Sequence, residues 1–297
     1  MAGIPDVIAA GATWSLVWHG TDNADGIVGT PDGGLLFAQE QPSRVSKLDS
    51  SDKVSVLAED TRGAGSLALD AQGRIFAVQR TCTDPGLNAP CSEPTTIGII
   101  HPVSERKLLA DKFNGKPLGR LNDLVADRKG GVYFTVGGVY YASPEGIVTS
   151  IGENLRTNGI MLSPDERTLY VTNGPMIVAF DVQPDGTVRN QRDFAKLEAG
   201  GSGDGMAVDG AGRLYVTSNA GVQVFSLEGR YLGLIPTPRN VISVAFSGPD
   251  KKTLYVVGSG ALDGAGKEVT TPSGVRNNAK SIFKIPMLAQ GFKGRAK

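Results

Sequence analysis

The sequence lacks an excess of charge of either sign: its 297 residues include 30 Lys and Arg and 30 Asp and Glu. No basic stripe is visible, so nucleic acid is not an expected partner. Apolar runs are short, and none reaches the roughly 18 residues of a membrane-spanning helix, so no membrane segment is expected. No repeated segment carries the 3.6-residue helical period, which argues against helical and leucine-rich repeat proteins.

Cysteine is also scarce. Cys82 and Cys91 flank a loop rich in Pro, Gly and Asn, and we expect a local disulfide, with two free thiols as the alternative. A disulfide predicts a periplasmic or secreted protein, whereas free thiols would suit a cytoplasmic one. The N-terminus has no charged leader followed by an apolar segment, so we expect that a signal peptide has been removed before Met1.

Glycine, in contrast, is abundant, with 40 residues, and it recurs in a repeated pattern. The clearest copy, Gly203–Thr217, reads as a short apolar strand, a turn of Asp and Gly, and a second β-rich strand. Six copies recur with a spacing of about 40 residues, the period of four-stranded propeller blades. Their second strands begin near Leu35, Ile75, Val132, Leu169, Leu214 and Leu254. The sequence therefore predicts an all-β, six-bladed β-propeller, with residues 1–297 as a single domain.

The two ends of the chain are expected to meet in the last blade. The final copy has no obvious fourth strand after Ser281–Ile285, whereas the β-rich segment Trp14–Trp18 precedes the first copy. We therefore predict that the N-terminal strand completes the sixth blade. Such closure removes the free sheet edges that invite aggregation.

Several copies carry a polar residue just before their first strand. First strands line the central channel of a propeller, so equivalent residues of successive blades should meet at one end of it. Four of these residues have side-chain oxygens: Asp25, Asn122, Asn158 and Asp204. They predict a hard, flexible cage for a divalent metal, most suited to Ca²⁺, with Mg²⁺, Mn²⁺ or an opportunistic Zn²⁺ as alternatives. No His or Cys shares the position, which argues against a dedicated zinc site.

The same residues also have a purely structural interpretation. Asp-Gly and Asn-Gly are among the commonest turn dipeptides. The metal interpretation depends on the shared position. These residues precede a first strand, whereas the aspartates of the hairpin turns follow it; the latter are Asp70, Asp127 and Asp209.

Four segments carry a family resemblance: Gly119–Val125, Arg156–Ile160, Gly203–Asp209 and Phe246–Val256. With them, essentially the whole chain resembles the family of gluconolactonase, senescence marker protein (regucalcin) and luciferin-regenerating enzyme. The resemblance implies a six-bladed propeller with one central divalent metal. It implies that Asn158 and Asp204 are metal ligands, that Asn122 lies at the metal or the substrate, and that Arg120 holds substrate oxygens.

The chain departs from the family pattern in two places. The family usually has Glu at the first ligand position, where this chain has Asp25. Because Asp is one methylene shorter, we expect the metal to shift toward blade one or a water to bridge the gap. Many gluconolactonases continue the blade-three strand with an acidic, Pro-containing loop, which Val136–Gly138 replaces here. The shorter loop lowers one wall of the mouth, and we expect Tyr140 to contact substrate there.

The resemblance and the cage of oxygen donors together imply metal-assisted opening of a lactone, either a sugar lactone or a similar cyclic ester. We expect a monomer or weak homo-oligomer. The cation would polarise the ester carbonyl and lower the pKa of a water. Asp204 would bind the metal and accept the water's proton, with Asp123 as an additional or alternative base. Arg120 would stabilise the developing oxyanion or bind substrate hydroxyls.

Other interpretations remain open. The same metal site could hydrolyse other esters or organophosphates, or the propeller could be a non-enzymatic, metal-stabilised binding protein. A strictosidine-synthase-like enzyme would need a buried glutamate near the channel, for which Glu40 is the candidate. An arylesterase-like enzyme would favour a histidine base; His101 is expected at the surface, and His19 lies nearer the predicted mouth.

Overall fold

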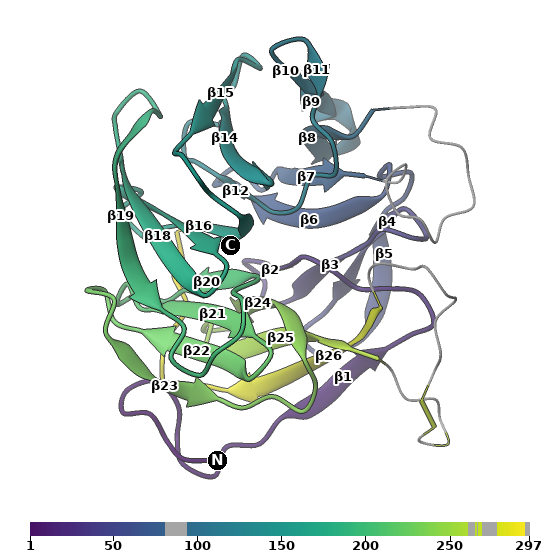
Figure 1. The fold of residues 1–297 in the computed structure, drawn as a ribbon. Helices are drawn as coiled ribbons and strands as arrows, with labels where there is room; N and C mark the ends of the chain where they lie inside the picture. The colour runs from purple at the N-terminus through teal and green to yellow at the C-terminus, as the bar shows by residue number, and fades with distance from the viewer. Residues whose placement is uncertain (81–93, 261–264, 266, 269–277, 295–297) are drawn as a thin grey trace.

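The computed structural model describes residues 1–80, 94–260, 265, 267–268 and 278–294. In this part of the chain, the strands form six antiparallel sheets of four strands, arranged as a ring (Figure 1). This confirms the predicted six-bladed propeller. The predicted disulfide between Cys82 and Cys91 lies outside the described residues.

Each blade takes its strands in chain order from the channel outward, except that the last blade ends on the N-terminal strand. Blades one to three are β2 (Ile27–Gly29), β3 (Leu35–Gln39), β4 (Arg44–Leu48) and β5 (Val54–Ala58); β6 (Ala64–Leu69), β7 (Ile75–Gln79), β8 (Thr96–His101) and β9 (Lys107–Ala110); and β12 (Leu124–Ala126), β13 (Val132–Val136), β14 (Gly138–Ala142) and β15 (Val148–Ile151). Blades four to six are β16 (Thr157–Leu162), β17 (Thr168–Asn173), β18 (Met176–Val182) and β19 (Val188–Lys196); β20 (Met206–Val208), β21 (Leu214–Ser218), β22 (Gly221–Phe225) and β23 (Tyr231–Ile235); and β24 (Val241–Ser247), β25 (Thr253–Ser259), β26 (Ala279–Pro286) and β1 (Ser15–His19).

The described residues add a few short elements between the blades. A 3-10 turn, η2 (Val103–Glu105), follows β8, and β10 (Lys112–Phe113) pairs with β11 (Lys116–Pro117) before blade three. None of the helical segments described is long and apolar enough to cross a bilayer.

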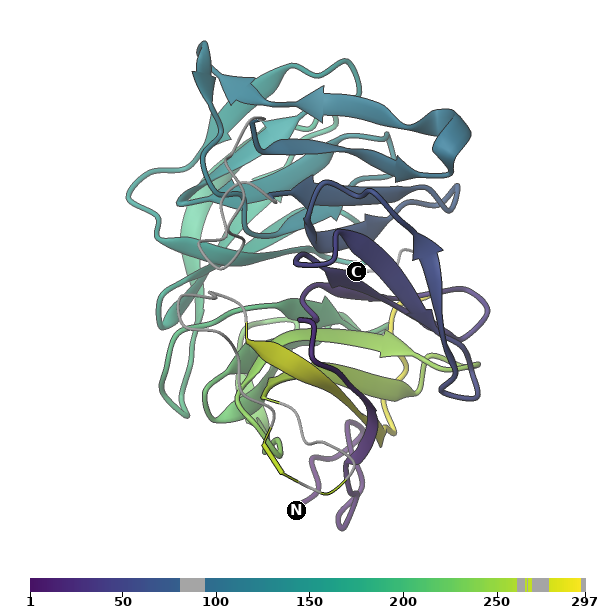
Figure 2. The same ribbon diagram turned by 90° about the vertical axis from the view of Figure 1, so that its right-hand side faces the viewer.

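The N-terminal strand closes the ring, as predicted. Strand β1 pairs antiparallel with β26, with Ser15 opposite Lys284 and His19 opposite Ser281. Figures 1 and 2 show the purple first strand beside the yellow last one. The first and last strands of the chain are thus held in one sheet.

The hairpin turns between first and second strands are held by aspartate side chains. In three blades, one carboxylate oxygen accepts two backbone N–H groups of its own turn, at 2.8–3.0 Å; these residues are Asp70, Asp127 and Asp209. Such local bonds are the reason that Asp favours turns. They explain why the hairpin repeat was legible in the sequence.

Buried aromatic side chains fill the space between blades. Phe37 and Phe134 are the third residues of the second strands of blades one and three, Phe76 is the second residue of that strand in blade two, and all are fully buried. Burial of each ring stabilises the folded state by roughly 1.5–3 kcal/mol relative to an exposed ring and so holds the inner strands in place. The inner strand ends therefore provide a rigid frame for side chains that face the channel.

Candidate metal and substrate site

All six blades contribute to a cavity of about 410 Å³ at one end of the inner strands. Ten residues line it: Asp25, Arg80, Arg120, Leu121, Asn122, Asn158, Asp204, Ile242, Asn278 and Ala279. The four residues predicted to converge as metal ligands are all among them. Their common position in the repeat therefore corresponds to a common place in the fold.

The glycines that follow three of these residues allow neighbouring blades to touch. A Cβ atom at Gly159 would lie 2.0 Å from the carbonyl oxygen of Asp204, and one at Gly205 would lie 2.7 Å from that of Ile242. A Cβ at Gly26 would meet blade two's backbone at 2.6 Å. None of the three glycines has the positive φ of a turn glycine. The Asp-Gly and Asn-Gly pairs here are thus contacts between inner strands, and the turn interpretation does not apply to them.

The side-chain oxygen of Asn158 is buried and has no hydrogen-bond partner among the described residues. Its backbone carbonyl, in contrast, accepts a 2.6 Å hydrogen bond from the Thr135 hydroxyl. A buried acceptor left unpaired costs about 1–3 kcal/mol, so this oxygen is poised for a cation or a donor. Its position in the cavity with the side chains of Asp25 and Asp204 favours a cation.

Backbone bonds fix Asp204 just before β20. Its N–H donates to the carbonyl of Thr217 at 3.0 Å, and the N–H of Thr217 donates back to Gly205 at 3.0 Å. The Thr217 hydroxyl also donates to Ile242 of the next blade at 3.3 Å. The half-buried carboxylate of Asp204 therefore projects into the cavity from a fixed strand end.

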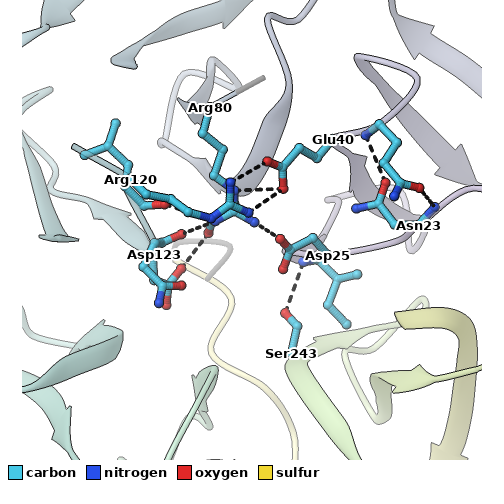
Figure 3. Close-up of polar contacts among 12 residues, drawn as sticks. Asn23, Asp25, Glu40, Arg80, Arg120, Asp123 and Ser243 are labelled. Carbon is cyan, nitrogen blue, oxygen red and sulfur yellow. Dashed lines mark hydrogen bonds and ion pairs between the residues drawn. The ribbon is translucent and has the colours of Figure 1, made fainter. Parts of the chain in front are cut away.

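Asp25 has a partner that the sequence did not predict. Its Oδ2 accepts a hydrogen bond from Nη2 of Arg80, which follows β7 and is only 5% exposed (Figure 3). Nη1 of Arg80 donates to the carbonyls of Leu121 at 3.1 Å and Asn122 at 3.2 Å. Arg80 thus connects the first predicted ligand to the segment before blade three.

A fully buried glutamate holds both cavity arginines (Figure 3). Glu40 accepts a 3.0 Å bond from Nε of Arg80, and its two carboxylate oxygens accept bonds of 3.0 and 3.1 Å from the Nη1 and Nη2 atoms of Arg120. Such a forked pair fixes the guanidinium plane. Arg120 is therefore oriented in advance at the cavity wall, and Glu40, the strictosidine-synthase-like candidate, serves as its anchor.

A shared position could have revealed this network. Glu40 directly follows the second strand of blade one, and Arg80 directly follows that of blade two, 40 residues later. Opposite charges at equivalent positions of adjacent blades are expected to meet near the axis.

Asp123, predicted as an additional or alternative base, lies beside the cavity in a contact between blades. Its Oδ1 accepts bonds from the hydroxyl of Ser66 at 2.5 Å and the N–H of Leu124 at 2.9 Å, and its Oδ2 accepts from the N–H of Ile160 at 3.1 Å. The carboxylate is 6% exposed and is not among the groups that line the cavity. This geometry connects blades two, three and four.

Tyr140 also lies away from the described cavity lining. Its ring stacks on Phe134 with centroids 5.5 Å apart and meets the edge of Phe113 at 5.2 Å. After the short loop that follows β13, this ring thus packs against neighbouring strands. Of the two histidines, His19 is exposed at the end of β1 and His101 ends β8, and neither lines the cavity.

A larger groove, of about 620 Å³, is lined by residues of blades three and four, including the turn residues Asp127 and Glu166. Asp127 there accepts backbone bonds through Oδ1 and the hydroxyl of Tyr141 through Oδ2 at 2.8 Å. This carboxylate is thus used to hold the turn and its neighbouring strand.

The donor atoms of the central cavity suit a hard divalent cation. Two carboxylates, Asp25 and Asp204, and two carboxamides, Asn122 and Asn158, line the cavity. Among the described residues, no three His, Cys, Asp or Glu side chains form a metal-binding group, so any site here must include amide oxygens. The unpaired Asn158 oxygen fits such a site, while the Arg80 guanidinium already occupies one side of Asp25.

Comparison with known proteins identifies the family. The model of the SMP-30/Gluconolactonase/LRE-like region matches residues 15–260. The chain belongs to this family. It is 27% identical over 300 residues to a gluconolactonase of Zymomonas mobilis, which covers 86% of this chain and 78% of that protein. A pentonolactonase of Haloferax volcanii is 29% identical over 187 residues, or 58% of this chain and 64% of that protein.

Two solved structures have the same fold. A gluconolactonase of Xanthomonas campestris superposes with a TM-score of 0.74 at 24% identity, covering 96% of this chain and 95% of that one. A calcium-binding protein, regucalcin, of Agrobacterium tumefaciens gives a TM-score of 0.68 at 16% identity, covering 95% and 98%. The family match confirms the resemblance found in the sequence motifs.

Proposed function

We propose that this SMP-30/Gluconolactonase/LRE-like protein is a lactone hydrolase that uses a divalent cation in its central cavity. Its relatives include a gluconolactonase and a pentonolactonase, which supports hydrolysis of a sugar lactone or a similar cyclic ester. One structural observation supports the cation: the partnerless Asn158 oxygen lies in a cavity lined by two carboxylates.

The proposed ligands are Asp25, Asn122, Asn158 and Asp204. Hard oxygen donors favour Ca²⁺, with Mg²⁺, Mn²⁺ or Zn²⁺ as possible substitutes. A related structure, regucalcin, is described as calcium-binding, which agrees with this preference.

A bound divalent cation supplies a Lewis acid for the lactone carbonyl and lowers the pKa of a nearby water. Asp204 accepts the proton as the water oxygen bonds to the carbonyl carbon. Arg120, held in place by Glu40, donates to the developing oxyanion or to ring hydroxyls. When the ring C–O bond breaks, Asp204 donates this proton to the leaving alkoxide. The product is an open-chain hydroxy acid.

The apolar part of the cavity orients the substrate ring. Leu121, Ile242 and Ala279 line the cavity between the polar groups. Apolar walls with a few convergent polar groups are typical of small-molecule sites. This combination suits a compact cyclic ester better than an extended polymer.

A pH-indicator assay on glucono-1,5-lactone and simple alkyl lactones tests the proposal. Chelator should abolish turnover, and Ca²⁺ or Mn²⁺ should restore it. Asp204→Asn should lower kcat by at least about 10²-fold at saturating cation while the far-UV circular dichroism is unchanged. Wild-type turnover in that variant would contradict the assignment of Asp204. If no lactone is turned over and chelation lowers only the Tm, the result would instead favour a non-enzymatic binding protein.

The same screen should include aryl esters and an organophosphate triester. Faster hydrolysis of these than of any lactone would favour the alternative reaction on the same cation.

A further inference from the structure

We propose that Arg80 competes with the cation for Asp25 and thereby weakens cation binding, keeping the cation-free protein stable. The inference rests on the cation site of the proposed function. It concerns how tightly that site binds, independently of which ester is hydrolysed.

Arg80 is held in place by several groups at once. Besides Asp25, it donates to Glu40 at 3.0 Å and to the carbonyls of Leu121 and Asn122 at 3.1 and 3.2 Å. Its side chain is almost completely buried. A guanidinium with this many fixed partners cannot move away from Asp25 without breaking other bonds.

Blade two makes room for this arginine. The position that carries Asp25 in blade one and Asn122 in blade three is Gly65 in blade two. A Cβ atom at Gly65 would lie 2.2 Å from both Cζ and Nε of Arg80. The guanidinium therefore occupies the place that a side chain of blade two would otherwise fill.

Charge gives the direction of the effect. The cavity and its anchor contain three carboxylates, Asp25, Glu40 and Asp204, and two guanidinium groups, Arg80 and Arg120. Their formal sum is −1, and removal of Arg80 makes it −2. A cation on Asp25 would share that carboxylate with a positive group that is in direct contact with it. Both the loss of repulsion and the freed carboxylate should therefore tighten cation binding.

The test is calorimetric titration of CaCl₂ and of MnCl₂ into chelator-treated, full-length protein. Arg80→Met should lower the Kd by at least tenfold and should lower the Tm of the cation-free protein. Added cation should then raise the Tm of this variant by more than it raises the Tm of the wild type. Arg80→Lys, which keeps the charge, should tighten binding much less. An unchanged or higher Kd in Arg80→Met, or equal tightening in both variants, would overturn the proposal.

A second variant leaves Arg80 itself intact. Gly65→Ala should push the flexible end of Arg80 off Asp25 and lower the Kd several-fold. Gly210→Ala is its control, because the nearest atom to a Cβ there is 3.5 Å away, at ordinary contact distance. An unchanged Kd in Gly65→Ala, with Arg80 visibly displaced in its crystal structure, would also overturn the proposal.

These outcomes separate the inference from the proposed function. If the wild type binds the cation tightly and Arg80→Met binds it no more tightly, the inference alone is overturned. Binding only after Arg80 is removed supports the inference and overturns cation dependence in the wild type. No binding by either protein overturns both.

Discussion

The contact between blades four and five at Gly159 allows a quantitative test of how the cavity is built. A methyl group at Gly159 would lie 2.0 Å from the carbonyl oxygen of Asp204 and 2.9 Å from its carbonyl carbon. Real contacts of this kind lie beyond about 3.0 Å, so Gly159→Ala must move the strand ends apart by roughly 1 Å. Overpacking of this size costs about 1–3 kcal/mol of the free energy of unfolding.

The same displacement should affect turnover more than stability. Asp204 and Asn158 lie on the two sides of the contact, and a misplacement of about 1 Å at a reacting group can cost ~10²-fold in rate. We therefore expect Gly159→Ala to lower kcat by about 10²-fold on lactones and to weaken Ca²⁺ binding.

Urea unfolding and lactone kinetics measure both effects, with Gly210→Ala as the matched control. A Cβ at Gly210 would meet its nearest neighbour, the Gln290 carbonyl oxygen, at 3.5 Å. We expect this control to stay within about 0.5 kcal/mol of the wild type, with unchanged kcat. If Gly159→Ala behaves like the control in both assays, close approach of the blades does not determine the geometry of the site.

Three further predictions follow from individual contacts. Asp123→Asn should lower the free energy of unfolding by about 1.5–3 kcal/mol, because it weakens the hydrogen bonds that the carboxylate accepts from Ser66, Leu124 and Ile160. It should lower kcat less than tenfold. Loss of turnover with unchanged stability would instead indicate that Asp123 acts as a base. Tyr140→Phe should leave KM unchanged, since the ring packs on Phe134, and a tenfold rise in KM would place its hydroxyl at the substrate. Burial raises the pKa of Tyr255 from 10.0 to about 12 and also raises the pKa of three more tyrosines: Tyr133, Tyr141 and Tyr215. The unfolded chain therefore loses these protons first, and stability that is complete below pH 10 should fall above it by up to ~1.4 kcal/mol per tyrosine per pH unit; a flat free energy of unfolding between pH 9 and 11.5 would contradict this.

The fold could be predicted because its repeat depends on local chemistry. In three hairpin turns an aspartate, such as Asp209, bonds backbone groups two and four residues later, so the turn is encoded within a few residues. Because the blades repeat around a ring, residues at equivalent positions of different blades lie at the same end of the central channel. This is why Asp25 and Asp204, distant in sequence, could be expected in one cavity.

The remainder of the site depends also on side-chain reach: equivalent positions could have indicated the Glu40–Arg80 pair, but not that Arg80 reaches Asp25. Arg80 enters the cavity from the end of a second strand, and only a long side chain beside a glycine can do so. Tyr140 lies outside the described cavity lining for a related reason. The shortened loop was expected to bring the ring to the mouth, but the ring packs against the edge of Phe113, from the short β10 strand before blade three.

Asp25, which departs from the family pattern, and its partner Arg80 are best understood as one coupled pair. A glutamate at position 25 would extend one methylene further, toward the place where the guanidinium now lies. Asp25→Glu alone should therefore crowd Arg80 and improve Ca²⁺ affinity little, whereas Asp25→Glu with Arg80→Met should bind more tightly than the two single changes predict. Residues in direct contact show coupling energies of about 0.5–3 kcal/mol, so we expect more than about 1 kcal/mol in this double-mutant cycle. Calorimetric Kd values for the four proteins measure it. Additivity within about 0.5 kcal/mol would mean that the two residues act independently, and the shorter carboxylate would then need a different explanation.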